Sequence, residues 1–481
     1  MNKVELAEIV NITTGKLDSN AAVPNGKYKY FTCAPEPLYI NEFAFDDDVI
    51  LIAGNNAQGN FHINRFKGKF NAYQRTYVLT SKNGNNLDYI YYKLKLELKR
   101  LKNDAQGSQT KFLTMPILKN IKIEQLGSNI QKKIASVLSS LDDKIELNNK
   151  INVELEAMAK ALYDYWFVQF EFPISDTEAL EVTDKNVTSN GVEKPYKSSG
   201  RKMVYNDVLK REIPEGWEVK TMEGQIDFTR GISYTSSTMN DFEGIPMINL
   251  KSFNLNGTYR IDGLKYFTGK INKSKIISKN DLLIAITDVT REGEIIGRAI
   301  LTPNFGMETT CSCDVARIDI LNNSFTKNYL RYLFNSKHYH DYIKYFASGT
   351  LVLHLDLNGV LWYQDAIPPK YLQDRFEDFV NSIDLKIANN QKQNKELSTL
   401  RDWLLPMLMN GQVKVADAEE QVLGMVAESE ENYNKTVILN KKESIEDRFQ
   451  LWLSNQKLAA RGGINETVLR EIFDVMDDED K

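Results

Sequence analysis

The chain has few of the residues that metal centres and disulfide scaffolds need. Its 481 residues include three cysteines and four histidines, and Cys311 and Cys313 are too close in sequence for an ordinary disulfide bridge. Neither a CxxC pair nor an HxxxH pair is present, so the sequence does not indicate a structural zinc site. His338 and His340 form a loose HxH pattern, which is more typical of a helix surface than of a pair of metal ligands.

Long apolar runs are also missing. No uninterrupted apolar segment approaches the roughly 20 residues that a helix needs to cross a bilayer. The N-terminal segment "MNKVELAEIVNITTG" lacks the basic region followed by an apolar region that marks a secretory signal. We therefore expect a cytoplasmic, globular protein, and the hydrophobic fraction of 42% in a chain of this length is enough for several cores, or roughly three domains.

Catalytic motifs are absent as well. The chain has no GxxxxGK[ST] phosphate loop, and "IPPK" from Ile367 lacks both the Asn or Asp and the aromatic residue with which adenine methyltransferases hold a flipped base. "DDKIELNNK" from Asp142 offers the carboxylates and lysine of a nuclease, but its heptad pattern places them on a solvated helix face. The sequence therefore predicts no catalytic, cofactor-binding or metal site within this chain.

What the chain does contain is a repeated segment. "IASVLSSLDDKIELNNK" from Ile134 and "FEDFVNSIDLKIANNQK" from Phe376 share six identical positions at a constant offset of 242 residues. In both copies apolar residues recur at heptad spacing, which predicts two long helices that seek helical partners. The polar residues Lys144 and Asn148, and Lys386 and Asn390, interrupt the two seams at the same places. Polar residues at such positions lower stability and set the register of a helix pair.

Each predicted helix follows a segment rich in strand signals. "DDDVILIAG" ending at Gly54 matches "SKNDLLIAI" ending at Ile286, and runs such as "YQRTYVLT" and "VARIDI" alternate between apolar and polar residues. These patterns predict an α+β fold with a pseudo-two-fold internal repeat, in which two β-rich domains are joined by two long, antiparallel coiled-coil helices. A helix of about 36 residues would span roughly 54 Å, which corresponds to about 16 base pairs of DNA.

The net charge of -5 conceals an uneven distribution. Residues 416–481 hold 8 Lys/Arg against 16 Asp/Glu, whereas residues 61–120 hold 12 Lys/Arg against 3 Asp/Glu. The basic stretch, with aromatic residues between its cations, could face a polyanion. Residues 221–360 are nearly balanced, with 15 Lys/Arg and 14 Asp/Glu, so we expect this part to add less to non-specific affinity for nucleic acid.

Several motifs, taken in order, are similar to those of specificity subunits of type I restriction-modification enzymes. They are "LGSNIQKKIASVLSSLDDKIELNNKI" from Leu126, "ALYDYWFVQFEFP" ending at Pro173, "KPYKSSGRKMVYND" from Lys194, "IPEGWEV" from Ile213 and "IPPKYLQDRF" from Ile367. The resemblance covers nearly all of residues 1–415. The first copy departs from the pattern because it has no "PEGW" counterpart, and the acidic tail has no counterpart in the family.

The resemblance implies the domain organisation. Two target recognition domains would occupy 1–125 and 213–370, two helical spacers 126–172 and 371–415, a linker 173–212, and an acidic tail 416–481. It also implies a non-catalytic subunit that recognises a bipartite site on double-stranded DNA. Its partners would be two DNA methyltransferase subunits and restriction or translocase subunits, with S-adenosylmethionine, ATP and Mg²⁺ bound by those partners and none by this chain.

The candidate DNA-binding residues combine base-edge donors with cations that can grip phosphate. They come from the segments that follow the two matched strands and from two Gly-hydroxyl loops. The set is Asn55, Asn56, Gln58, Asn60, His62, Arg65, Lys67, Lys69, Arg75, Ser108, Gln109, Lys111, Arg230, Thr287, Thr290, Arg291, Arg298, Ser348, Thr350 and His354. Replacing Arg65 and Lys67 by alanine is expected to weaken binding and to flatten its salt dependence.

Two other readings remain open on the sequence alone. A nuclease that acts by itself would cleave DNA without partners. A coiled-coil scaffold that binds only proteins would give no DNA shift at low salt. The bases recognised, the spacing between half-sites, the presence of a restriction subunit and the role of the tail are not encoded in any pattern that we can interpret.

Overall fold

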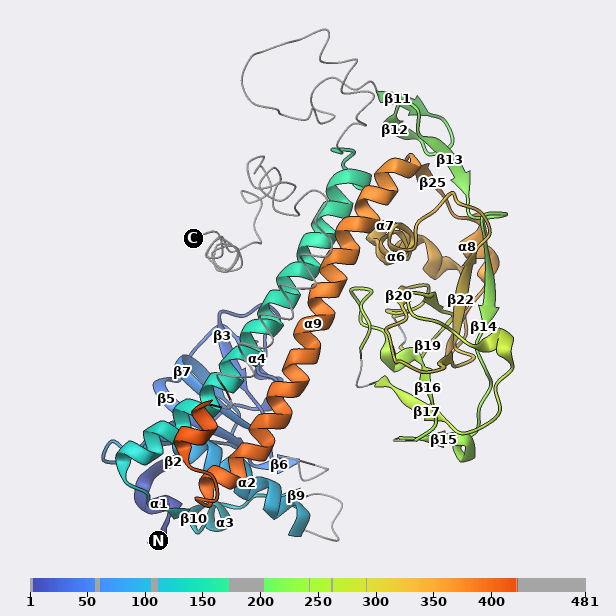
Figure 1. The fold of residues 1–481 in the computed structure, drawn as a ribbon. Helices are drawn as coiled ribbons and strands as arrows, with labels where there is room; N and C mark the ends of the chain where they lie inside the picture. The colour runs from blue at the N-terminus through green and yellow to red at the C-terminus, as the bar shows by residue number, and fades with distance from the viewer. Residues whose placement is uncertain are drawn as a thin grey trace, which may run out of the picture. The chain divides into compact units, whose positions relative to one another are not determined.

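The computed structural model describes residues 3–56, 61–104, 111–172, 203–241, 243–260, 263–290, 292–420 and 422. The chain divides into two compact units, Met1–Asn152 with Ala388–Lys481, and Val153–Ile387. Each unit contains a β-rich domain and one end of each long helix, α4 (Ser128–Tyr163) and α9 (Lys370–Met409). Figure 1 shows the elements by label. No helix among the described residues is both long enough and apolar enough to cross a membrane.

The first unit contains a six-stranded sheet with strand order β2-β8-β5-β7-β3-β4. Its strands are β2 (Val10–Thr14), β3 (Tyr28–Phe31), β4 (Leu38–Ile40), β5 (Phe45–Ala53), β7 (Ile63–Ala72) and β8 (Thr76–Ser81). The run Val49–Ala53 is buried throughout because β5 pairs with a strand on either side. The predicted strands at "VILIA" and "YVLT" are confirmed.

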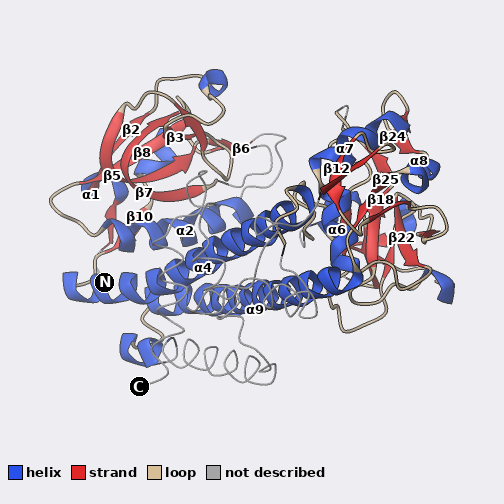
Figure 2. Cartoon of the chain, turned by 90° about the horizontal axis from the view of Figure 1, so that it is seen from above, coloured by secondary structure: helices blue, strands red, loops and turns tan. Residues whose placement is uncertain are grey.

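Short elements complete the first domain. They are β1 (Lys3–Glu5), α1 (Leu6–Ile9), η1 (Ser19–Ala21), β6 (Asn55–Asn56), α2 (Leu87–Asp104), β9 (Lys111–Phe112), α3 (Met115–Lys119) and β10 (Lys122–Glu124). Strand β1 pairs with β10, which brings the start of the domain to its end. Helix α2 lies between the sheet and the long helices (Figure 2), and its buried residues share one core with α4 and α9.

The second unit contains a four-stranded sheet with order β14-β22-β18-β20 and a second four-stranded sheet with order β15-β17-β16-β21. Their strands are β14 (Ile226–Arg230), β15 (Met239–Asn240), β16 (Ile245–Ile248), β17 (Lys265–Phe267), β18 (Leu282–Ala285), β20 (Ala299–Leu301), β21 (Thr310–Cys311) and β22 (Val315–Ile320). Strand β18 is the counterpart of β5: it is buried at every position and lies between two partners.

The other elements of this unit surround the two sheets. Its strands are β11 (Met203–Asn206), β12 (Arg211–Pro214), β13 (Glu218–Thr221), β19 (Thr287–Asp288), β23 (Ala347–Ser348), β24 (Leu353–Leu355) and β25 (Gln364–Ile367). Its helices are the π-helical turn η2 (Asp164–Val168), η4 (Ser236–Thr238), η5 (Leu250–Ser252), η7 (Lys273–Lys275), α6 (Lys327–Asn335), α7 (Lys337–Ile343), η8 (Lys344–Phe346) and α8 (Leu357–Trp362). Strand β13 pairs with β25, as β1 does with β10 in the first domain.

Within the first unit, α4 and α9 run antiparallel. Asp142 accepts a hydrogen bond from Arg401, Asn148 donates to Asn394 at 2.8 Å, and Asn390 donates to Asn152 at 2.8 Å. Residue numbers rise on one helix as they fall on the other, which defines the direction. Asn148 is 2% exposed, so the polar position predicted in the seam is a buried, hydrogen-bonded one.

Within the second unit the same two helices meet through aromatic side chains. The ring of Phe376 lies 5.9 Å from that of Tyr163 and 5.2 Å from that of Phe167, measured between centroids. The π-helical turn Asp164–Val168 at the end of α4 places Trp166 and Phe167 in this cluster. The heptad spacing in the sequence includes Phe376, together with Leu372 and Phe379, but it does not include Tyr163, Trp166 or Phe167.

The structure places two units of mixed helix and strand content where the sequence predicted two β-rich domains. The domain boundaries, the coiled-coil spacer and the internal duplication stay predictions. One detail of the predicted linker 173–212 differs, because its last residues form the hairpin β11–β12. Asn206 accepts hydrogen bonds from the backbone N–H groups of Val208 and Leu209 at 3.0 Å, and Lys210 adopts a positive φ of 53°, which together close the turn.

Candidate nucleic-acid interface

In both domains the segment that follows the buried central strand pairs with a segment near the end of the domain. In the first domain Asn55 pairs with Phe112, and in the second Thr287 pairs with His354. The backbone hydrogen bonds correspond too: Leu113 N donates to Gly54 O, and Leu355 N donates to Ile286 O, both at 2.9 Å. Two candidate segments that are distant in sequence therefore meet in each domain.

In the second domain this pairing extends to a row of three candidate residues. Strand β24 lies between β19 and β23, so that Thr287, His354 and Ser348 are direct neighbours across the three strands. His354 and Ser348 are exposed, whereas Thr287 is 5% exposed and donates its hydroxyl proton to Asp314 at 3.0 Å. The row therefore offers two side chains to a ligand, and the third stabilises the fold.

The loop after β19 is organised by a buried carboxylate. Asp288 is fully buried and accepts hydrogen bonds from the backbone N–H groups of Thr290 at 2.7 Å, Ile295 at 2.7 Å and Ile296 at 3.1 Å. The Thr290 hydroxyl also donates to Asp288 at 2.8 Å and accepts from Glu294 N at 3.1 Å. Thr290 therefore has a structural task within the loop that it was predicted to use for DNA contact.

Arg298 does not extend toward solvent as a candidate phosphate ligand should. Its guanidinium donates to the carbonyl of Glu294 at 2.6 Å and to that of Asn335 at 3.4 Å, and lies 3.5 Å from His340 Nδ1. Burial lowers the pKa of Arg298. These contacts tie the loop to α6 and α7, so the structure assigns Arg298 an internal role. Arg230 and Thr350, by contrast, are exposed.

Burial of His340 beside Arg298 makes the stability of the second domain depend on pH. Burial, followed by the positive charge of Arg298, lowers the pKa of His340 from 6.5 to about 4. Between those values the unfolded chain binds a proton that the folded domain excludes, so the free energy of unfolding should fall as pH falls through this window. We expect His340→Gln to flatten this fall, measured as melting temperature between pH 7 and 4.5. His338→Gln, which changes an exposed neighbour, is the control; an equal pH dependence in wild type and His340→Gln would contradict the assignment.

The basic stretch of the first domain is largely matched by acidic residues. Arg65 forms ion pairs with Asp48 and, at 2.8 Å, with Asp88. In the register of β5 and β7, Lys67 lies opposite Asp48 and Lys69 lies opposite Asp46. Opposite charges at directly paired positions attract one another across a sheet. Arg65 is therefore paired with two carboxylates, and the exposed Lys67 and Lys69 have carboxylates beside them.

The remaining candidate residues of this domain differ in how exposed they are. Arg75 is exposed, and His62 is half-buried with its pKa lowered by burial. Asn55 is half-buried in β6. Candidates that lie outside the described residues are Gln58, Asn60, Ser108, Gln109 and Arg291. For Asn56 and Lys111 only the strand pairing between β6 and β9 is described.

One group of cations was missed by the sequence interpretation. Between Gly263 and Asn280 the chain carries five lysines and no Asp or Glu, and Lys270, Lys273 and Lys279 are exposed. The signal was present in the sequence, but the balanced charge of residues 221–360 as a whole concealed it. In the described part of the chain, no group of three or more His, Cys, Asp or Glu side chains could hold a metal ion.

Comparison with known proteins gives consistent matches. The family model described as "Type I restriction modification DNA specificity domain" matches residues 1–157. The EcoDI specificity subunit of Escherichia coli is 31% identical over 214 residues, which is 44% of this chain and 46% of that protein. The MjaIX specificity subunit of Methanocaldococcus jannaschii is 29% identical over 356 residues, 70% of this chain and 71% of that protein. The chain thus spans less than half of the first relative and about two thirds or more of the second.

A solved structure shares the fold. The crystal structure of a type I restriction-modification S subunit from M. genitalium aligns with a TM-score of 0.50 at 17% sequence identity. The alignment covers 85% of this chain and 95% of that one.

Proposed function

We propose that the chain is a specificity subunit of a type I restriction-modification system, that it is the DNA-reading subunit of such a complex, and that it carries out no catalysis itself. Each β-rich domain would read one half of a split site on double-stranded DNA. The observation that supports this most directly is the shared pairing next to the central strand, which brings two polar candidate segments together in each domain.

The two long helices would act as the spacer between the half-sites. Helix α4 has 36 residues, which at 1.5 Å per residue correspond to roughly 54 Å, or about 16 base pairs. The buried asparagines of the helix pair would fix its register, since each hydrogen-bonded partner is satisfied in only one alignment. Duplication of an ancestral half-molecule accounts for the antiparallel direction, because two identical halves related by a two-fold axis present the same helix in opposite directions.

The proposed partners follow from family membership. Two methyltransferase subunits would dock on the helices and methylate adenine with S-adenosylmethionine, and restriction subunits would use ATP and Mg²⁺. Those cofactors would bind the partners. The DNA target would place the complex in the cytoplasm.

Mapping of methylated adenines tests the proposal. In a host that expresses this chain with its methyltransferase, we expect one bipartite motif with a constant spacing, and we expect modification to cease when two base pairs are inserted between the halves. A single undivided motif, or no motif at all, would contradict it. Cleavage of DNA by the purified chain alone would favour a self-contained nuclease, and the lack of any DNA shift at low salt would favour a protein-binding scaffold.

A further inference from the structure

The missed lysines form a cationic segment, which we call the lysine segment, Gly263–Asn280. Lys265 forms an ion pair with Asp241. In the described part of the chain, Lys270, Lys273 and Lys279 form no ion pair with a carboxylate, and all three are exposed. Since each exposed ammonium group is free to exchange its counterion, the segment has the electrostatic property that phosphate binding requires.

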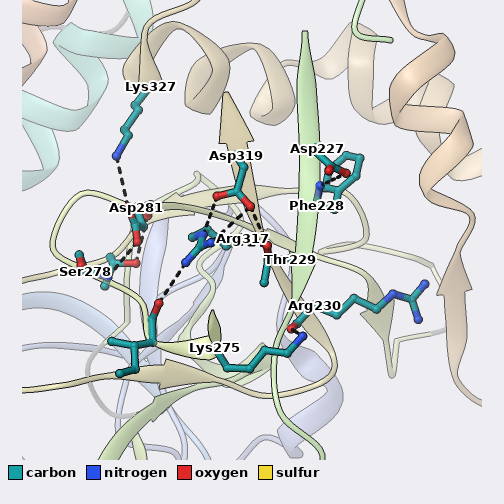
Figure 3. A network of polar contacts seen from close by, with 12 residues as sticks. Asp227, Phe228, Thr229, Arg230, Lys275, Ser278, Asp281, Arg317, Asp319 and Lys327 are labelled. Atoms are coloured by element: carbon teal, nitrogen blue, oxygen red, sulfur yellow. Dashed lines mark hydrogen bonds and ion pairs between the residues drawn. The ribbon is translucent and has the colours of Figure 1, made fainter. Parts of the chain in front are cut away.

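Two carboxylates close to this segment, Asp281 and Asp319, already have partners. Asp281 pairs with Lys327 at 3.3 Å and accepts a hydrogen bond from Ser278 N at 2.8 Å. Asp319 pairs with Arg317 at 2.7 Å and accepts from the Thr229 hydroxyl at 2.6 Å. Figure 3 shows both carboxylates turned toward these partners. They are therefore compensated within the domain and do not neutralise the lysine segment.

The segment is held in a defined position. Lys275 donates its ammonium proton to the carbonyl of Arg230 at 2.8 Å, and its own carbonyl accepts from the Thr310 hydroxyl at 2.9 Å. Asn272 caps η7 by accepting from Ser274 N at 3.1 Å. The exposed guanidinium of Arg230 extends away from Asp281 and Asp319 (Figure 3). These contacts thus hold Lys275 beside Arg230 at the end of β14.

The first domain provides the contrast. There the exposed Lys67 and Lys69 lie opposite Asp48 and Asp46 in the sheet, so that a nearby phosphate would compete with a built-in carboxylate. Although residues 61–120 have the larger net positive charge, both exposed lysines of strand β7 lie opposite carboxylates. Local pairing, not net charge, decides how many counterions a surface can release.

We propose that the lysine segment, with Arg230, binds the phosphate backbone of duplex DNA and supplies more of the salt-dependent affinity than strand β7 does. The inference rests on the proposed function and adds a surface to it. It also reverses the expectation that the second domain contributes less to non-specific affinity.

Two variants with the same loss of charge test the proposal. Lys270→Gln/Lys273→Gln and Lys67→Gln/Lys69→Gln would be compared with wild type as full chains, by titrating a mixed-sequence 30-base-pair duplex at several salt concentrations. The slope of log affinity against log salt changes by about 0.9 for each phosphate contact removed. We expect the slope to become shallower by roughly 2 for the first variant and by clearly less than 1 for the second.

The outcomes are distinguishable. Equal slopes for wild type and Lys270→Gln/Lys273→Gln, or a larger change in the strand β7 variant, would overturn this inference while leaving DNA binding intact. The lack of any salt-dependent binding by wild type would overturn the proposed function and the inference with it. Lys270→Arg/Lys273→Arg keeps the charge and should restore the wild-type slope; if it does not, the loss reflects altered folding and the assignment to phosphate contacts is wrong.

Discussion

Phe376→Ala is expected to lower the free energy of unfolding of the second unit by about 3–5 kcal/mol, the range for truncating a fully buried phenylalanine. Phe376 is fully buried where α9 begins. Its ring centroid lies 5.2 Å from that of Phe167, 5.3 Å from that of Tyr332 and 5.9 Å from that of Tyr163. Residues of η2, α6 and α4 therefore pack against this one side chain of α9. Truncation would leave a cavity that three helices cannot close together, because each is anchored elsewhere in the unit.

Urea denaturation followed by tryptophan fluorescence measures the effect, since Trp166 lies in the same cluster with its ring 6.3 Å from that of Phe376. Val168→Ala is the matched control: Val168 belongs to the same π-helical turn as Trp166 but is 50% exposed, and its truncation should cost less than about 0.5 kcal/mol. A loss below 1 kcal/mol for Phe376→Ala would show that the cluster contributes packing without holding the helices together.

The heptad pattern predicted the helices well but their buried faces less well. The predicted spacers 126–172 and 371–415 contain α4, Ser128–Tyr163, and nearly all of α9, Lys370–Met409. Yet Ile130, which falls on the heptad Ile130, Ile134, Val137 and Leu141, is 48% exposed. Val380, which falls outside the heptad Leu372, Phe376, Phe379 and Ile383, is fully buried. The physical reason is that each helix also packs against a β-rich domain. Buried Ala135 and Leu138, for instance, share a core with α2. A seam inferred for two helices alone cannot include such contacts.

The end of α9 is determined by local backbone signals that the heptad spacing does not include. Pro406 lies inside the helix, which ends at Met409, and Gly411, two residues later, has a φ of 67°. Asn410 N donates to the carbonyl of Pro406 at 3.0 Å and Gln412 N donates to that of Met407 at 2.8 Å, which satisfies carbonyls that the ending helix leaves unpaired. Gly411 is a stop signal for a helix that can be recognised in the sequence.

The sequence predicted which segments form the candidate site, but it did not predict which of their side chains are available to a ligand. Matched strands and Gly-hydroxyl loops identified the right parts of the chain, because strand position follows from hydrophobic runs. Whether a cation is available depends on pairing across strands: Asp46 and Asp48 lie outside the basic window 61–120 and nevertheless sit opposite Lys69 and Lys67 in the sheet. Similarly, the charge that neutralises Arg65 comes from β5 and from the start of α2. No count along the sequence contains this information.

Asp288→Ala is expected to disable the second domain's reading loop while the rest of the domain stays folded. The substitution removes the acceptor of three backbone N–H groups, those of Thr290, Ile295 and Ile296. Each buried donor left without an acceptor costs about 1–3 kcal/mol, so we expect the unfolding free energy to fall by about 3 kcal/mol or more. Asp288→Asn keeps one carbonyl oxygen as an acceptor and should lose roughly half as much.

The substitution should also weaken DNA binding, because the loop lies next to the row that contains His354 and Ser348 and contributes Thr290 itself. Loss of even one well-placed base contact costs about 1–3 kcal/mol, which corresponds to roughly 5- to 150-fold weaker binding to the cognate duplex. Glu292→Ala changes an exposed carboxylate in the same loop and should leave cognate affinity within about twofold of wild type. If Asp288→Ala loses stability yet keeps cognate affinity, the loop is a structural closure of the domain, and base reading must be assigned to the β23–β24 hairpin alone.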